Sequence, residues 1–164
     1  MTFYKKISSI EPSLFSNEKI AVRRILDDYD LWFATVECML DPKQQELVNP
    51  AGFSIGRAYL KPYDNYPCII CDEYGKRIGF INFCKWLADG EATTWSYYID
   101  KNSQGSGYGK KVAETAVKIL RAACPDLPIK LAVDIGNEKA LIIYESLGFY
   151  DSGELDGDEH VFIS

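Results

Sequence analysis

A glycine-rich segment, Gln104-Gly105-Ser106-Gly107-Tyr108-Gly109-Lys110, constrains the fold of this chain more than any other feature. It lies between a predicted strand at 92–100 and a predicted helix at 110–124. Glycines let backbone N–H groups approach an anion closely, and the N-terminus of a helix adds positive potential. The segment therefore predicts a loop that binds a phosphate or pyrophosphate group.

The surrounding elements follow from hydrophobic periodicity and turn residues. The helix at 110–124 is predicted from apolar residues at i, i+4, i+7, i+8 and i+11: Val112, Ala116, Ile119, Leu120 and Ala123. Strands are predicted at 68–72, 77–86, 92–100, 129–134, 149–155 and 159–163, with turns at 73–76 and 88–91. A second helix begins at Asn137, a plausible N-cap, and ends before Gly148.

The first third of the chain is harder to assign. We predict a strand at 3–7 and helices at 18–29 and 32–48, and no single state for 53–66. The absence of a linker or repeat, together with the length of 164 residues, predicts one domain, 1–164. Its class is α/β (α+β), with a mixed, mostly antiparallel sheet flanked by helices.

The spacing of the glycines excludes two well-known phosphate loops. A Walker A loop has four residues between its glycines and then Lys-Ser/Thr, whereas Gly105 and Gly109 have three between them, and Lys111 follows Lys110. A dinucleotide fingerprint has the pattern G-x-G-x-x-G near the start of a βαβ unit. This segment is G-x-G-x-G behind an antiparallel meander. It fits instead the pattern Q-x-x-G-x-G.

With Q-x-x-G-x-G and the later pattern Asn137-x-x-Ala140-x-x-x-Tyr144-x-x-Leu147-Gly148-Phe149, the chain resembles the GNAT superfamily of acetyl-CoA-dependent N-acetyltransferases. The resemblance covers residues 68 to about 154. Within that superfamily the chain is similar to the spermine/spermidine (polyamine or diamine) acetyltransferases, through Ile99-Asp100, Gly107–Lys111 and Gly153–Gly157. The resemblance implies the GNAT acyl-CoA N-acyltransferase fold, acetyl-CoA as cofactor and a small cationic amine as substrate. The strand segment 94–98 lacks the Arg or acidic residue that such relatives tend to carry there.

The resemblance also implies roles for individual residues. Backbone N–H groups of the loop would hold the coenzyme A pyrophosphate: Gln104, Gly105, Ser106, Gly107, Tyr108, Gly109 and Lys110. The backbone of Tyr98, Ile99 and Asp100 would pair with the pantetheine arm as an added strand would. An N–H group near Tyr98 would polarise the thioester carbonyl. Asn137 would hydrogen-bond to the pantetheine or to the sulfur end.

Tyr144 is the predicted general acid and a cofactor contact. A phenol with a pKa near 10 can protonate a departing thiolate. The alternative is that Ala140, Tyr144 and Leu147, spaced i, i+4 and i+7, form a stripe that simply packs in the core.

Carboxylates supply the remaining candidates. Glu91 is our first candidate for the general base and Glu37, expected to border the acceptor groove, is the second. For each of them, a solvated carboxylate without a catalytic role is the favoured alternative, and no base is needed if the groove lowers the pKa of the amine. Glu154 is a predicted substrate contact within an acidic cluster of Asp151, Glu154, Asp156, Asp158 and Glu159. That cluster is either a solvated hairpin or an acceptor surface that attracts a polycation.

Composition excludes several other classes. With 18 Lys and Arg against 24 Asp and Glu, the net charge of −6 argues against nucleic-acid binding. A single histidine, His160, makes a histidine-based triad improbable, and no metal site is expected. Cys68 and Cys71 form a C-x-x-C pair inside an apolar run, which favours reduced core thiols over a redox or zinc site. No signal peptide or membrane span is visible, so we expect a cytoplasmic protein without a membrane partner.

The resemblance to the GNAT polyamine acetyltransferases therefore implies acetyl transfer from acetyl-CoA to a primary amine of a small cationic acceptor, with a polyamine as the expected substrate, by direct attack in a ternary complex. Two alternatives stay open: an aminoglycoside or protein N-terminal acetyltransferase, and a non-catalytic acetyl-CoA-binding module. Because relatives in the family are often dimers, a homodimer is also expected.

Overall fold

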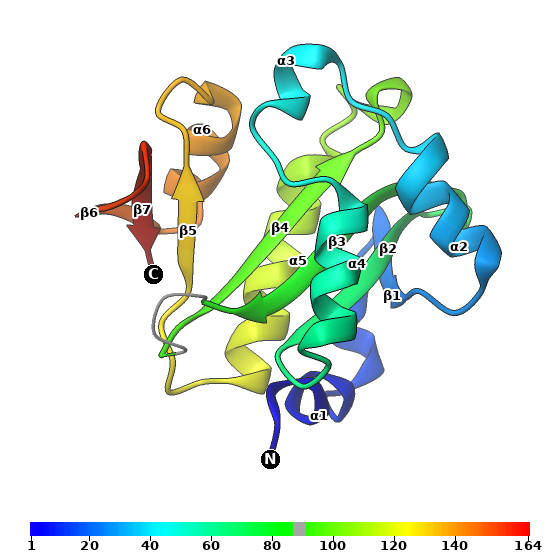
Figure 1. The fold of residues 1–164 in the computed structure, drawn as a ribbon, viewed down its shortest axis with the longest axis horizontal. Helices are drawn as coiled ribbons and strands as arrows, with labels where there is room; N and C mark the ends of the chain where they lie inside the picture. The colour runs from blue at the N-terminus through cyan, green and yellow to red at the C-terminus, as the bar shows by residue number, and fades with distance from the viewer. Residues whose placement is uncertain (87–90) are drawn as a thin grey trace.

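The computed structural model describes residues 1–86 and 91–164, which form a four-stranded and a three-stranded sheet (Figure 1). The first sheet is an antiparallel meander of β1 (Ile20–Arg24), β2 (Asn65–Asp72), β3 (Arg77–Lys85) and β4 (Thr93–Ile99). The second has the order β5 (Lys130–Val133), β7 (Glu159–Ile163), β6 (Tyr150–Asp156), also antiparallel. The predicted mixed, mostly antiparallel sheet is therefore confirmed.

The two sheets meet at one end and separate at the other. At the joined end, Thr93 forms a parallel bridge with Ile129, and its N–H donates to the Pro128 carbonyl at 2.9 Å. Beyond that bridge the described parts of β4 and β5 form no ladder, and Figure 1 shows them diverging toward the C-terminal end of β4. Diverging strands leave backbone hydrogen-bonding groups on their facing edges, which an added extended chain can pair with.

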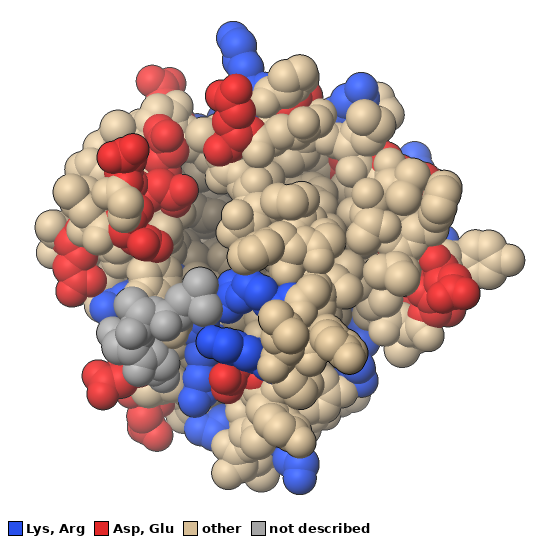
Figure 2. Space-filling view, viewed as in Figure 1, with Lys and Arg blue, Asp and Glu red and all other residues tan. Residues whose placement is uncertain are grey.

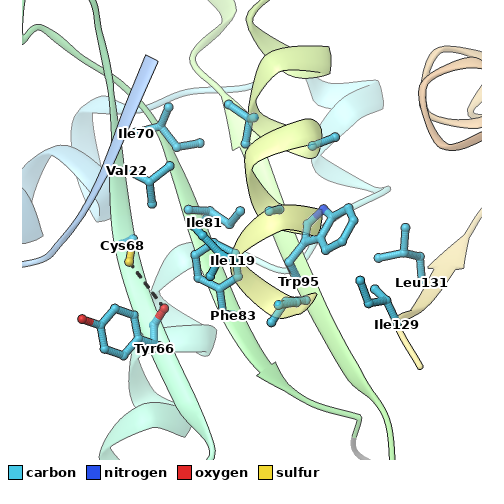
Figure 3. Close-up of a cluster of buried hydrophobic side chains, with 14 of the residues drawn as sticks. Val22, Tyr66, Cys68, Ile70, Ile81, Phe83, Trp95, Ile119, Ile129 and Leu131 are labelled. Atoms are coloured by element: carbon cyan, nitrogen blue, oxygen red, sulfur yellow. Dashed lines mark hydrogen bonds between the residues drawn. The ribbon is translucent and has the colours of Figure 1, made fainter. Parts of the chain in front are cut away.

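Helices cover both faces of the first sheet, so its central strands are buried on both sides. α1 (Phe3–Ser8) and α5 (Tyr108–Ala123) pack on one face, and a π-helical turn (Phe33–Glu37) and α4 (Ala51–Leu60) pack on the other. The preceding helix, α2 (Asp28–Trp32), is held to β1 and β3 by ion pairs of Asp30 with Arg23 and Arg77. Val22, Ile70, Ile81 and Ile119 belong to the core on the α5 side (Figure 3). Burial on both faces explains the continuous apolar run in β2.

The later elements agree with the sequence predictions. The helix α6 (Glu138–Ser146) begins at Asn137, whose side chain accepts the Ala140 N–H at 3.3 Å, and is followed by Gly148 at φ +89°. The turn at 73–76 is confirmed, with Gly75 at φ +83°. The predicted turn at 88–91 lies mostly outside the described residues. The segment 53–66 contributes most of α4 and the start of β2.

Three predictions before residue 50 are wrong. Residues 3–7 are helical, because Phe3 and Ile7 are four apart and both buried, and the Thr2 hydroxyl accepts the Lys5 N–H. Residues 20–24 of the predicted helix 18–29 form β1, because buried Ile20 and Val22 alternate with more exposed neighbours against β2.

The predicted helix 32–48 is interrupted after the π-helical turn, and only α3 (Pro42–Gln45) follows. The Asp100 carboxylate accepts the Met39 N–H at 2.9 Å, and the Lys101 N–H donates to the Met39 carbonyl at 2.7 Å. These contacts hold residue 39 in an extended connection to the end of β4. At its N-terminus the chain therefore begins with the helix α1, and the strand β1 follows.

The cysteine pair on β2 is not one site. Cys68 and Cys71 are three residues apart on a strand, so their thiols lie in different cores on opposite faces of the sheet. All five cysteines are free thiols, and four are buried. Within 1–86 and 91–164, no cluster of His, Cys, Asp and Glu is suited to a metal ion, and no helix is long and apolar enough to span a membrane.

Candidate active site

A groove of about 970 Å³ occupies the space where the two sheets diverge, and Figure 2 shows the hollow. It is bordered by β4, the glycine-rich loop, the start of α5, the end of β5, α6 and the tip of the last hairpin. The predicted residues that line it are Tyr98, Ile99, Gln104, Gly105, Gly107, Tyr108, Gly109, Lys110, Asn137 and Tyr144. A smaller hollow of about 510 Å³ beside Arg121 and Ser164 contains none of the predicted site residues.

The glycine-rich loop presents an uncapped helix N-terminus to this groove. Gly105 has φ +87°, and Gly107, the N-cap residue of the 16-residue helix α5, has φ +80°. No side chain among the described residues caps α5, so the N–H groups of its first turn are available to an anion from outside the helix. This donor set fits the pyrophosphate of coenzyme A.

A lysine that the sequence did not indicate lies beside the loop. Lys19 donates to the Ser106 carbonyl at 2.8 Å, and its ammonium lies 5.8 Å from the centre of the Tyr108 ring. Lys110 lines the groove, whereas Lys111 points to Glu18 at 2.7 Å. No local signal could have identified Lys19, because 87 residues separate it from Ser106.

Two of the predicted cofactor residues use their side chains to hold the fold. The Gln104 amide donates to the Ile99 carbonyl at 2.8 Å and pairs reciprocally with the Gln44 amide at 2.9 Å. The Asp100 carboxylate accepts the N–H groups of Met39 and Asn102. Asp100 and Ser106 are not among the described lining residues. Gln104 and Asp100 thus fix the shape of the loop that follows β4.

The direction of the β4 backbone shows which N–H groups near Tyr98 face the groove. The Thr93 N–H points to the β5 side, at Pro128, whereas the Asp100 N–H donates to Ile78 on β3 at 2.7 Å. The β3–β4 register is continuous, and N–H groups alternate between the edges of a strand. Alternation therefore assigns the groove-facing N–H groups to Tyr97 and Ile99, and turns that of Tyr98 toward β3. The Tyr98 side chain also points away, with its hydroxyl donating to the Ala34 carbonyl and accepting the Ala51 N–H.

Two phenols lie on the groove near the divergence of the strands. The Tyr97 hydroxyl donates to the Gly109 carbonyl at 3.0 Å, and burial raises the pKa of Tyr97 well above its usual value. Burial raises the pKa of Tyr144 to about 12, while the neighbouring Trp95 indole N–H acts in the opposite direction. Tyr144 packs in an aromatic group, with ring centres 6.0 Å from both Trp95 and Phe149. The phenol is therefore protonated at neutral pH while lying on the groove wall.

Carboxylates gather at the side of the groove formed by the second sheet. Asp134, Asp156 and Glu159 line it, and Figure 2 shows acidic side chains over the region that Figure 1 assigns to α6 and β5–β7. Burial, followed by the charges of Asp156 and Asp134, raises the pKa of Glu159. Mutual repulsion of this kind makes a site that favours a cation.

The three carboxylates singled out from the sequence lie elsewhere. Glu37, Glu91 and Glu154 are exposed and are not among the described residues that line the groove. Glu154 approaches Lys130 at 3.3 Å. The sequence identified the acidic hairpin, but only the fold shows that Asp156 and Glu159 face the groove and that Asp134 joins them.

Comparison with known proteins agrees with this geometry. A model of the acetyltransferase (GNAT) family matches residues 29–149. A probable spermine N(1)-acetyltransferase of Bacillus subtilis subsp. natto (strain BEST195) is 35% identical over 60 residues, which are 37% of this chain and 40% of that protein. The match thus spans less than half of that curated relative.

Solved structures share the fold at low identity. The spermidine N-acetyltransferase of Vibrio cholerae, in complex with CoA and spermine, superposes with a TM-score of 0.67 at 18% identity over 90% of this chain and 94% of that one. An acetyltransferase of Agrobacterium tumefaciens str. C58 gives 0.69 at 16% identity over 91% and 92%. The family model covers well over half of the residues, and the chain belongs to the acetyltransferase (GNAT) family.

Proposed function

We propose that this protein transfers the acetyl group of acetyl-CoA to a primary amine of a small polycation, with a polyamine such as spermidine or spermine as the preferred acceptor. The observation that carries the proposal is the polarity of the groove. Its loop end offers uncapped N–H groups and Lys110 for an anion, and its other side offers Asp134, Asp156 and Glu159 for a cation. The spermine and spermidine acetyltransferases among the similar proteins support the same acceptor class.

On this proposal, the loop from Gly105 to Lys110 and the first turn of α5 hold the pyrophosphate, with Lys19 adding positive charge. The edge of β4 pairs with the pantetheine arm, and a groove-facing N–H of Tyr97 or Ile99 polarises the thioester carbonyl. Bound acetyl-CoA supplies an acetyl group activated as a thioester.

Residues of the chain then bind the ammonium groups of the acceptor and donate a proton during direct attack in a ternary complex. Asp134, Asp156 and Glu159 hold ammonium groups of the acceptor. Tyr144 gives its phenol proton to the departing sulfur. Glu91 and Glu37 are not among the described residues that line the groove, so the attacking amine loses its proton to water. The value of kcat/KM should therefore rise with pH toward the ordinary pKa of an alkylamine, near 10.

The test is thiol release from acetyl-CoA across polyamines, aminoglycosides and peptides, with Tyr144→Phe as the matched variant. We expect release with polyamines and a fall in kcat of about 100-fold in Tyr144→Phe, with CoA affinity unchanged. Release only with aminoglycosides or peptides would move the acceptor to those classes. CoA binding without release for any amine would identify a non-catalytic binding module. Sedimentation of the full chain would check the predicted homodimer.

A further inference from the structure

Trp95 carries a buried hydrogen-bond donor that the fold leaves without an aligned partner. Its side chain is 5% exposed, and its indole Nε1–H makes no hydrogen bond to any described residue. Buried polar groups are nearly always paired, and an unpaired one costs free energy. Trp95 also lines the groove, so this donor lies at the wall of the candidate active site.

The indole is held beside Tyr144 by packing. Figure 3 shows it extending from β4 toward the strand that carries Leu131, across the space where the sheets diverge. Its ring meets Tyr144 at 75° and Phe149 at 86°, with centres 6.0 and 5.8 Å apart. The neighbouring N–H lowers the pKa of Tyr144, against the larger effect of burial. A neutral phenol oxygen accepts only a weak hydrogen bond from this donor, whereas a phenolate oxygen would accept a strong one.

We propose that the Trp95 indole N–H donates a hydrogen bond to the Tyr144 oxygen when that phenol gives up its proton, and that Trp95 is thereby a positioning residue for the general acid. The inference rests on the proposed function of Tyr144. In the step, the O–H bond of Tyr144 breaks and an S–H bond forms on the departing thiolate. The phenolate oxygen keeps the electron pair until it takes a proton from water.

Other titratable groups surround the same groove. In the described part of the chain these are Glu46 after α3, Arg57 on α4, Cys84 on β3, Tyr97 and Tyr98 on β4, Tyr108 and Lys110 on α5, Asp134 after β5, Lys139 on α6, and Asp156 and Glu159 on the last hairpin. Tyr97 interacts electrostatically with Tyr144, and the Tyr97 hydroxyl donates a hydrogen bond to the Gly109 carbonyl. The Trp95 indole N–H, in contrast, has no hydrogen-bond partner among the described residues.

The experiment titrates the phenol directly. Tyr144→3-fluorotyrosine is introduced into the full chain, and its ionisation is followed by ¹⁹F NMR, which needs no substrate. Trp95→Phe removes the N–H, and Trp95→β-(3-benzothienyl)alanine removes it while keeping the ring shape, so a folding defect in the first variant leaves the second to decide. Phe149→Leu is the matched control, because it changes the packing of the same phenol without removing a donor.

We expect both Trp95 variants to raise the ionisation midpoint by about one pH unit, and Phe149→Leu to leave it unchanged or lower it, because a smaller side chain lessens the burial of the phenol. Shifts no larger than that of Phe149→Leu would overturn the inference. With a polyamine acceptor, Trp95→Phe should lower kcat by up to about tenfold in the wild-type chain and not further in Tyr144→Phe. A chain without transferase activity would refute the proposed function, whereas an active chain with unshifted midpoints would refute the role of Trp95 alone.

Discussion

Replacement of Gly107 separates the stability of the loop from its capacity to bind an anion. Gly107 has φ +80° at the N-cap of α5, so Gly107→Ala forces a side chain into the left-handed region, at about 1 kcal/mol. Within the part of the chain that the structure describes, the new Cβ would meet the Lys19 Nζ alone, at 3.7 Å, which is an ordinary contact, so backbone strain accounts for the cost to folding. For a chain of this size, 1 kcal/mol lowers Tm by about 2–4 °C.

The effect on CoA binding should be larger than the effect on stability. A methyl group on the loop surface displaces a phosphate from the N–H groups at the start of α5. Loss of one charge-assisted hydrogen bond, at about 1.5–3 kcal/mol, weakens binding by about 10- to 100-fold. Isothermal titration with CoA measures the affinity, and thermal unfolding measures the stability.

Gly75→Ala is the matched control. Gly75 has φ +83° in the β2–β3 turn, and a Cβ there would meet no atom of residues 1–86 or 91–164 within 4 Å. It should therefore lose the same stability and bind CoA as the wild type does. Unchanged CoA affinity in Gly107→Ala, or equal loss of affinity in both variants, would refute the loop as the phosphate site.

Three further predictions concern other parts of the chain. Asp30→Ala should cost about 3 kcal/mol, because its fully buried carboxylate pairs with Arg23 at 2.6 Å and Arg77 at 2.8 Å, two guanidiniums that stay about one-third exposed. The Arg23 hydrogen bond lowers the pKa of Asp30, so this stabilisation is complete above about pH 4 and falls as the pH drops toward the folded value. Urea midpoints of both proteins should converge in acid; a constant difference would contradict this. Glu159→Gln should raise stability near pH 7, because a carboxyl with a raised pKa stabilises the folded chain only at low pH, and should raise KM for spermine; an unchanged KM would count against the acidic acceptor side. Asn137→Ala should lose about 1 kcal/mol by removing the cap of α6, measured by urea unfolding, whereas Asn137→Ser should restore most of it.

The second half of the fold could be predicted because its signals are local. The stripe of Val112, Ala116 and Ile119 has the helical period, and Asn137 and Gly148 mark the two ends of α6. Prediction failed in the first third of the chain, where short segments are compatible with either a helix or a strand. Phe3 and Ile7 carry only one helical repeat, and Ile20 and Val22 only one strand repeat, so packing against α5 and β2 decided the state of each.

The sequence by itself determined that this chain has a glycine-rich loop ahead of an amphipathic helix, and a tyrosine on the helix that follows, because glycine conformational freedom and helical periodicity depend on neighbouring residues. Tertiary structure alone decided which groups share the groove. The fold directs the N–H groups of Tyr97 and Ile99, rather than that of Tyr98, toward the groove, because N–H groups alternate between the two edges of β4. It also brings Asp134 to Asp156 and Glu159, and leaves Glu37, Glu91 and Glu154 outside. Such choices depend on strand direction and on contacts between segments many residues apart, which no local pattern encodes.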